Sequence, residues 1–205
     1  MNPIPILHQD PHLLVVHKPG GLLTIPGRTP EKADALWTRL RTQFPDHDVR
    51  LVHRLDRDTA GLMVFALDKP TQAALGRQFE RRQVQKRYFA IVSGQLTPPS
   101  GVITAPLRKD WTRNDPPVYI VDPDKGKSAE THWDTAWQSN TETALHLKPV
   151  TGRSHQLRVH MAHLGHPIVG DPIYGTPDPQ RGLQLTAVAL AFTHPVSLKL
   201  LKFNI

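Results

Sequence analysis

The stretch HRLDRDTAGLMVFAL, residues 53–67, joins a highly charged segment to an apolar one. The continuous apolar run GLMVFAL (61–67) predicts a buried central strand. In an extended segment before it, alternate side chains point to opposite faces, so Arg54 and Asp56 would share a face. A carboxylate beside a cation stays ionised, and partial burial makes it a stronger nucleophile or base than a carboxylate in water. Asp56 is therefore either one half of a surface ion pair or a working group.

The rest of the chain predicts an α+β fold. Helices are expected in 30–44, in 70–82 and from an N-cap at Ser154 to Gly165. Strands are expected in the segments 13–18, 87–94, 132–138, 142–150, 185–192 and 197–203, with a hairpin turn at 139–141. The proline-rich segment 98–126 predicts irregular loops with one short strand near 118–121. Strands outnumber helices and do not alternate with them regularly. We therefore expect a single domain, residues 1–205, on a mixed, largely antiparallel β-sheet flanked by helices.

Composition and charge narrow the functional class. The 205 residues suit one domain, and the net charge of +7 with a pI of about 9.9 attracts polyanions such as RNA. The sequence has no cysteine, which excludes disulfides, thiolate chemistry and cysteine-based zinc sites. No run approaches the roughly 18 apolar residues of a membrane span, and the N-terminus does not have the pattern of a signal peptide. We expect a cytoplasmic protein without membrane contact.

The basic charge is concentrated in RQFERRQVQKR (77–87), where five basic residues accompany one acid. Such a segment can bind RNA phosphates without recognising the base sequence of the RNA. We expect RNA contacts from its basic side chains, Arg77, Arg81, Arg82, Lys86 and Arg87. Trp111 is expected in a loop, KDWTRNDPP, so it is a better candidate for an RNA contact than the tryptophans at helix or strand positions, which are usually core.

HRLDRDTAGLMVFALDK closely resembles the catalytic motif of the RluA-type pseudouridine synthases, in which HRLD precedes two variable residues and T/S-x-G. Further blocks resemble this family in the same order, and together they span roughly residues 7–200: LLVVHKPGGLLTIPG (13–27), KRYFAIVSG (86–94), PLRKDW (106–111), GKSAETHW (126–133) and TGRSHQLRVHMAHLGHPIVGDPIYG (151–175). One departure is Thr186, where the family usually has histidine. The N-terminal S4-type RNA-binding module of longer relatives is not expected here.

The resemblance implies the pseudouridine synthase fold and a role for each matched residue. Asp56 would begin cleavage of the uridine C1′–N1 bond, and Arg158 would form an ion pair with it. Arg54 would fill the space left by the flipped uridine, and Tyr88 would stack under the base and help to remove the C5 proton. The same motifs are expected to place further side chains at the RNA, namely His53, Arg57, Arg153 and His155.

The implied function is isomerisation of specific uridines to pseudouridine in structured RNA, with 23S rRNA and a tRNA anticodon stem-loop as expected substrates. Because the reaction involves no redox step and no outside group, we expect no cofactor. The partner would be RNA, and the protein a monomer. The alternative is a noncatalytic RNA-binding protein on the same scaffold. A glycosidase is less favoured, because that chemistry usually needs two carboxylates and only Asp58 is near.

Four histidines between residues 155 and 166 raise the question of a metal site. HExxH is absent, and within the helix only His160 and His163 have the i, i+3 spacing of a ligand pair. We expect no metal. His53, His155 and His160 are expected to bond to backbone groups or phosphate.

Overall fold

The computed structural model describes residues 3–114 and 116–205. The chain divides into two compact units, of which the first comprises Met1–Lys86 with Ala187–Ile205 and the second comprises Arg87–Thr186. The described residues form three α-helices and a largely antiparallel sheet. The predicted α+β class is therefore confirmed, whereas the expectation of one domain stays a prediction.

A buried antiparallel ladder forms the centre of the first unit. β2 (Leu13–Lys18) pairs with β4 (Ala60–Ala66), with Leu13 opposite Ala66 and Lys18 opposite Gly61. The outer strand β1 (Ile6–Gln9) pairs with β2, and the two-residue strand β3 (Arg50–Leu51) pairs with β4. β11 (Leu185–Thr193) follows β4 in the strand order and pairs with β12 (Leu200–Asn204). The strands predicted in these segments are confirmed.

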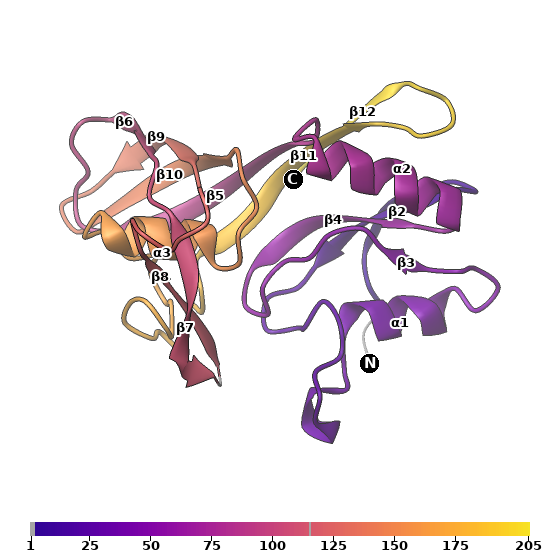
Figure 1. Cartoon of the computed structure of the whole chain (residues 1–205), viewed down its shortest axis with the longest axis horizontal. Helices are drawn as coiled ribbons and strands as arrows, with labels where there is room; N and C mark the ends of the chain where they lie inside the picture. The colour runs from indigo at the N-terminus through magenta and orange to yellow at the C-terminus, as the bar shows by residue number, and fades with distance from the viewer. Residues whose placement is uncertain (1–2, 115) are drawn as a thin grey trace. The chain divides into compact units, whose positions relative to one another are not determined.

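Two α-helices lie on opposite sides of the β2–β4 ladder in Figure 1. α2 (Lys69–Glu80) begins after Asp68, whose carboxylate accepts the amide of Thr71, and it packs Leu75 and Phe79 on the sheet. α1 (Leu36–Gln43) buries Leu36 and Leu40. A strand that is covered on both faces needs apolar side chains on both. This explains why β4 is a continuous apolar run and why β2 begins with four apolar residues, Leu13 to Val16.

The second unit is built on the strand order β5–β10–β9–β6. β5 (Gln85–Ser93) pairs with β10 (Glu142–Pro149), which forms the predicted hairpin with β9 (Thr131–Gln138). β6 (Ser100–Ile103) pairs with β9. α3 (Gln156–His163) packs Leu157 and Met161 into the core of this sheet. The predicted strand at 87–94 and the predicted hairpin are confirmed.

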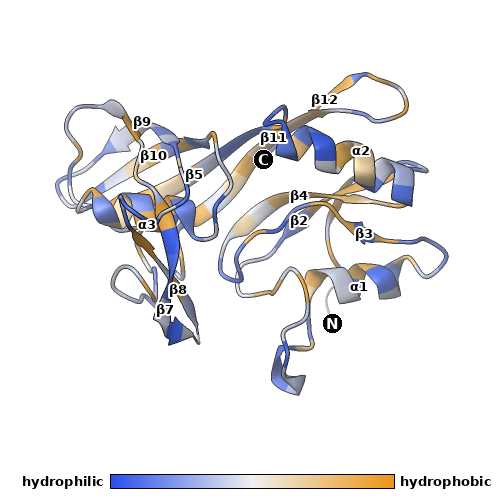
Figure 2. Ribbon diagram, in the orientation of Figure 1, coloured by the Kyte–Doolittle hydropathy of each residue, from blue (hydrophilic) through white to orange (hydrophobic). Residues whose placement is uncertain are grey.

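The prediction of irregular loops over 98–126 was wrong, although the short strand expected near 118–121 is confirmed. This segment contains β6 and a separate antiparallel hairpin of β7 (Leu107–Asn114) and β8 (Pro117–Val121). The hairpin's inner part joins a small cluster in which Leu107, Ala129 and Val159 are buried. Its outer end is hydrophilic (Figure 2). Pro117 is the first residue of β8, and the other prolines of the segment lie outside the strands. A proline at the first position of a strand is compatible with pairing, so a high proline content did not exclude strands here.

Two helix boundaries also differ from the prediction. The segment 30–44 forms a 3₁₀ turn, η1 (Pro30–Lys32), and then α1, because Ala35 is extended and bridges to Leu23. Ser154 does not cap α3: the N-cap is His155, in the left-handed region at φ 55°. The Gln156 side chain instead accepts the amide of Arg153 at 3.0 Å. The predicted end of α3 near Gly165 is borne out by its φ of +84°.

Candidate active site

The HRLDRD segment (53–58) leads into β4 in the first unit, and the exposure of its side chains changes from residue to residue. Leu55 is buried, Arg54 and Arg57 are exposed, and Asp56 is partly buried. The Thr24 hydroxyl donates to the Leu55 carbonyl at 2.7 Å and accepts the Leu55 amide at 3.3 Å. Thr24 of the KPGGLLTIPG loop therefore fixes the peptide groups of Leu55, immediately before Asp56.

Lys18 holds the backbone on the other side of Asp56. Its side chain is fully buried, and Nζ donates to the carbonyls of Arg57 at 2.8 Å, Leu22 at 2.6 Å and Pro19 at 2.9 Å. Burial lowers the pKa of Lys18 to about 8, and the carboxylates of Asp58 and Asp56 oppose that shift. Sequence reasoning gave Lys18 no role, although it is the lysine of the K-P-x-G-L block.

Arg57 and His53 both make local contacts in this segment. The Arg57 guanidinium binds the Asp58 carboxylate, with Nε to Oδ1 at 2.9 Å. The His53 ring stacks on Phe79 at a centroid distance of 4.5 Å, and its Nε2 accepts the Val64 amide at 3.1 Å. Burial, with a smaller contribution from Lys86, lowers the pKa of His53 to about 3. The expected backbone bond of His53 is confirmed, while its RNA contact stays a prediction.

The basic segment 77–87 covers the end of α2, the turn after it and the start of β5. Four of its five basic side chains are exposed, namely Arg77, Arg81, Arg82 and Arg87. Lys86 is partly buried, and burial lowers its pKa. The exposed arginines can offer their charge to a polyanion. Their contact with RNA stays a prediction.

In the second unit, α3 and β5 carry the other two predicted catalytic residues. Tyr88 lies opposite Leu147 in the β5–β10 ladder and packs against the core. Arg158 is buried and makes a bidentate pair with Asp171, since Nε and Nη2 each lie 2.7 Å from a carboxylate oxygen. Asp171 belongs to the quoted GHPIVGDPIYG block, but sequence reasoning assigned it no role. Asp56 belongs to the first unit, so its pairing with Arg158 stays a prediction.

The remaining predicted contact residues of the second unit lie on the hairpin and before α3. Trp111 was expected in a loop but lies on strand β7; it is nevertheless 71% exposed, and Lys109 Nζ lies 4.4 Å from its ring centroid. Arg153 is exposed and donates through Nε to the Ser128 carbonyl at 3.0 Å. His155 Nδ1 lies 2.8 Å from the Tyr174 hydroxyl. Thr186, the departure from the family pattern, is partly buried on β11.

A network of buried polar groups fixes α3. His160 Nε2 bonds to the Ala105 carbonyl and Nδ1 to the Thr131 hydroxyl, both at 2.9 Å. Gln156 Nε2 donates to that same hydroxyl at 3.1 Å. The bond of His160 to a backbone group was expected. The histidines of this region form no metal-binding group among the described residues.

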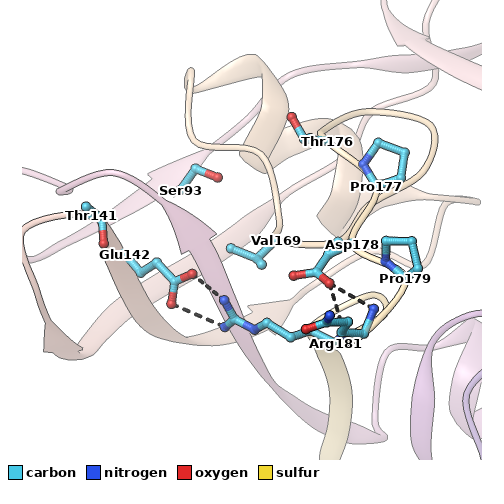
Figure 3. A pocket seen from close by; sticks show the side chains of 11 residues that line it. Ser93, Thr141, Glu142, Val169, Thr176, Pro177, Asp178, Pro179 and Arg181 are labelled. Atoms are coloured by element: carbon cyan, nitrogen blue, oxygen red, sulfur yellow. Dashed lines mark hydrogen bonds and ion pairs between the residues drawn. The ribbon is translucent and has the colours of Figure 1, made fainter.

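A pocket of about 580 Å³ opens elsewhere in the second unit (Figure 3). It is lined by Ser93, Thr141, Glu142 and residues of 169–181, and Arg181 pairs with Glu142 at its wall. None of the predicted site residues lines it. No described helix is long and apolar enough to cross a membrane.

Comparisons with known proteins agree with the motif resemblance. A sequence model of the family described as RNA pseudouridylate synthase matches residues 12–163. Several curated relatives are named dual-specificity RNA pseudouridine synthase RluA. The relative from Vibrio vulnificus is 46% identical, over 94% of this chain and 78% of the relative. The relative from Yersinia pestis is 44% identical, over 93% of this chain and 92% of the relative. The relative of the same name from Escherichia coli K12 is 44% identical over 93% of this chain and 87% of its own.

Solved structures agree in fold. The structure titled human RNA pseudouridylate synthase domain containing 1 has a TM-score of 0.80 and 27% identity, and covers 100% of this chain and 86% of its own. The structure titled human RNA pseudouridylate synthase domain containing 4 has a TM-score of 0.76 and 28% identity; the match covers 98% of this chain and 87% of that structure's chain.

Proposed function

The chain belongs to the RNA pseudouridylate synthase family, and from this premise we propose how its residues convert uridine in RNA to pseudouridine. The enzyme is an RNA pseudouridine synthase, and Asp56 is its catalytic carboxylate. The observation that carries this assignment is the support around Asp56. Thr24 and Lys18 fix the peptide groups on either side of a partly buried acid, and such support is expected for a group that must meet a reacting atom within a fraction of an ångström.

The reaction is an internal rearrangement of one nucleotide. The C1′–N1 bond breaks, the uracil turns, C1′ bonds to C5, the C5 proton leaves and N1 gains a proton. Asp56 acts at the sugar, and Arg158 keeps it ionised through an ion pair. Tyr88 supports the turning base and assists removal of the C5 proton. Since no electrons are gained or lost and no group is added, the residues need no cofactor.

A uridine inside a stem must leave the stack before Asp56 can reach its sugar, at a cost of a few kcal/mol. Arg54 takes the vacated space. The exposed arginines of the segment 77–87 hold the phosphates, and Arg57, Arg153, His155 and Trp111 add local contacts. Loop uridines are favoured because they are already unstacked.

The relatives named dual-specificity RNA pseudouridine synthase support two RNA substrates for this chain. We propose uridines of 23S rRNA and of a tRNA anticodon stem-loop. The enzyme acts in the cytoplasm as a monomer. Mapping pseudouridines in both RNAs from cells with and without this protein tests the substrates, and an unchanged pattern would exclude them.

The Asp56→Asn variant tests the chemistry. Pseudouridine formation, followed as tritium release from 5-tritiated uridine in unmodified transcripts, should be lost, while RNA affinity stays near that of the wild type. The matched control is Asp48→Asn, which removes one negative charge from an exposed side chain of the same unit. A wild-type rate for Asp56→Asn would rule out this assignment. RNA binding by the wild type without any tritium release would favour the noncatalytic binding protein.

A further inference from the structure

Arg158 is held more firmly than a solvent-facing arginine. Its side chain is 3% exposed and that of Asp171 is 0% exposed, and two guanidinium N–H groups meet both carboxylate oxygens at 2.7 Å. A guanidinium has five N–H donors in a rigid plane, so two fixed bonds determine where the other three point. The orientation of Arg158 thus depends on where Asp171 is held.

Asp171 is itself fixed by the backbone around it. Its Oδ1 accepts the amides of Ile173 at 2.9 Å and Tyr174 at 3.1 Å. The preceding Gly170 has φ +74°, and a Cβ there would lie 1.9 Å from the Gly182 carbonyl oxygen, so the chain at 170 is seated against residue 182. Burial by itself would raise the pKa of Asp171, but Arg158 and the two amides outweigh it and lower that pKa. The carboxylate is therefore a fixed anion.

Tyr174 supports the guanidinium from another direction. Arg158 Cζ lies 5.2 Å from the centroid of the Tyr174 ring. The ring cannot swing freely, because its hydroxyl accepts the Tyr119 amide and bonds to His155 Nδ1, both at 2.8 Å. The GDPIYG turn thus supplies both an anion and an aromatic ring to one buried arginine.

We propose that Asp171, supported by Tyr174, is the positioning residue of Arg158: it sets the direction of the guanidinium donors that act on the catalytic carboxylate. This inference rests on the proposed function, in which Arg158 keeps Asp56 ionised. A long arginine side chain loses substantial rotamer freedom when it is fixed. In this protein that freedom is lost on folding, before RNA binds, so the arginine need not be ordered during the reaction.

The central test is the Asp171→Asn variant, with single-turnover rate and RNA affinity measured separately on unmodified tRNA transcripts. A misplacement of about 1 Å can lower a rate about 10²-fold, so the rate should fall by about that factor. The dissociation constant should stay within about twofold, because Asp171 is buried and acts through Arg158. The matched control is Asp178→Asn. Asp178 accepts the amides at the same two offsets, those of Gln180 and Arg181 at 3.0 Å, without a buried arginine.

A double variant separates positioning from a general structural role. Asp171→Asn added to Arg158→Met should cost little beyond Arg158→Met alone, because residues that act as a unit are not additive. Multiplied losses would mean that Asp171 acts by another route and would overturn the inference. Replacing both charges also avoids leaving one buried charge unpaired.

Each remaining outcome is equally decisive. Should Asp171→Asn fail to fold by circular dichroism, Asp171→Glu keeps the charge and moves the carboxylate by one methylene, and a wild-type rate in that variant would contradict the inference. A folded Asp171→Asn with a wild-type rate, beside an impaired Arg158→Met, would defeat the positioning role and leave the proposed function intact. A wild-type rate in Arg158→Met would instead remove the proposed role of Arg158 and this inference with it.

Discussion

Asp56 is supported through the residues beside it. The carbonyls of Leu55 and Arg57 each accept a bond from a buried side chain, Thr24 in one case and Lys18 in the other. A buried ammonium is costly unless its donors are satisfied, and all three bonds of Lys18 go to carbonyls that fix the loop. The KPGGL block therefore helps to fix the backbone of the HRLD block, although the two are far apart in sequence.

His53 makes stability depend on pH. Its pKa is lowered to about 3 in the fold, against about 6.5 when unfolded, so between these values only the unfolded chain carries the proton. Stability is therefore lost as pH falls below about 6.5, by up to about 1.4 kcal/mol per pH unit. The His53→Gln variant keeps an acceptor for the Val64 amide and does not titrate.

Urea unfolding at pH 7 and pH 5 measures this difference. The free energy of unfolding of the wild type relative to His53→Gln should drop by about 2 kcal/mol between the two pH values. Other titrating groups, including the buried His160, are present in both proteins and cancel. A difference that does not change with pH would mean that His53 is not held neutral by the fold.

At the scale of elements, the β7–β8 hairpin was predicted only in part, as a short strand near 118–121, and its unpredicted strand β7 carries Trp111. We expect the Trp111→Ala variant to bind RNA about 1–3 kcal/mol more weakly, the typical loss when one base loses its stacking partner. Trp137→Ala is the matched control, since Trp137 is also exposed, at 47%, on β9 of the same unit. Filter binding measures both. Equal losses in the two variants, or none in either, would contradict a stacking role for Trp111.

At this scale the sequence predicts the elements whose determinants lie close together in the chain. Apolar runs and helical spacing are local, so β2, β4, α2 and the β9–β10 hairpin were predictable. The end of α3 was also local, because Gly165 adopts φ +84°. The start of α3 could not be predicted in this way, because the Gln156 side chain is hydrogen-bonded to Thr151 and Thr131 as well as to the Arg153 amide. Such a network depends on tertiary contacts that no spacing rule reveals.

The candidate active site shows the same contrast between residues predictable from local motifs and residues whose roles depend on tertiary contacts. Motif resemblance predicts catalytic roles for Asp56, Tyr88 and Arg158, and that prediction needs no knowledge of their neighbours. Lys18 and Asp171 were missed because their roles depend on partners 39 and 13 residues away in the chain. A charged residue next to glycine or proline in a loop reads as an ordinary turn residue. Only burial in the folded chain marks these two as supports.

At the scale of the whole molecule, the net charge of +7 makes RNA binding dependent on salt. Each phosphate neutralised on a single strand contributes about 0.7 to the slope of log affinity against log salt. Arg77 and Arg81 are exposed at the end of α2, so the Arg77→Gln/Arg81→Gln variant should lower that slope by about 1.4. At saturating RNA the single-turnover rate should not change, because phosphate contacts position RNA without entering the chemistry.

The control for this variant is Arg28→Gln/Arg41→Gln, which removes the same charge from exposed positions before and on α1, on the other side of the β2–β4 ladder from α2. If phosphates lie against the arginines, only the arginine variant changes the slope, since exposed charges beyond about 10 Å are screened at 0.1 M salt. If both variants weaken binding equally and leave the slope unchanged, the attraction comes from total charge, and the segment 77–87 is not a contact surface. Titrations of one transcript from 50 to 300 mM salt distinguish these outcomes, because over such a range direct contacts change the slope and diffuse charge changes mainly the intercept.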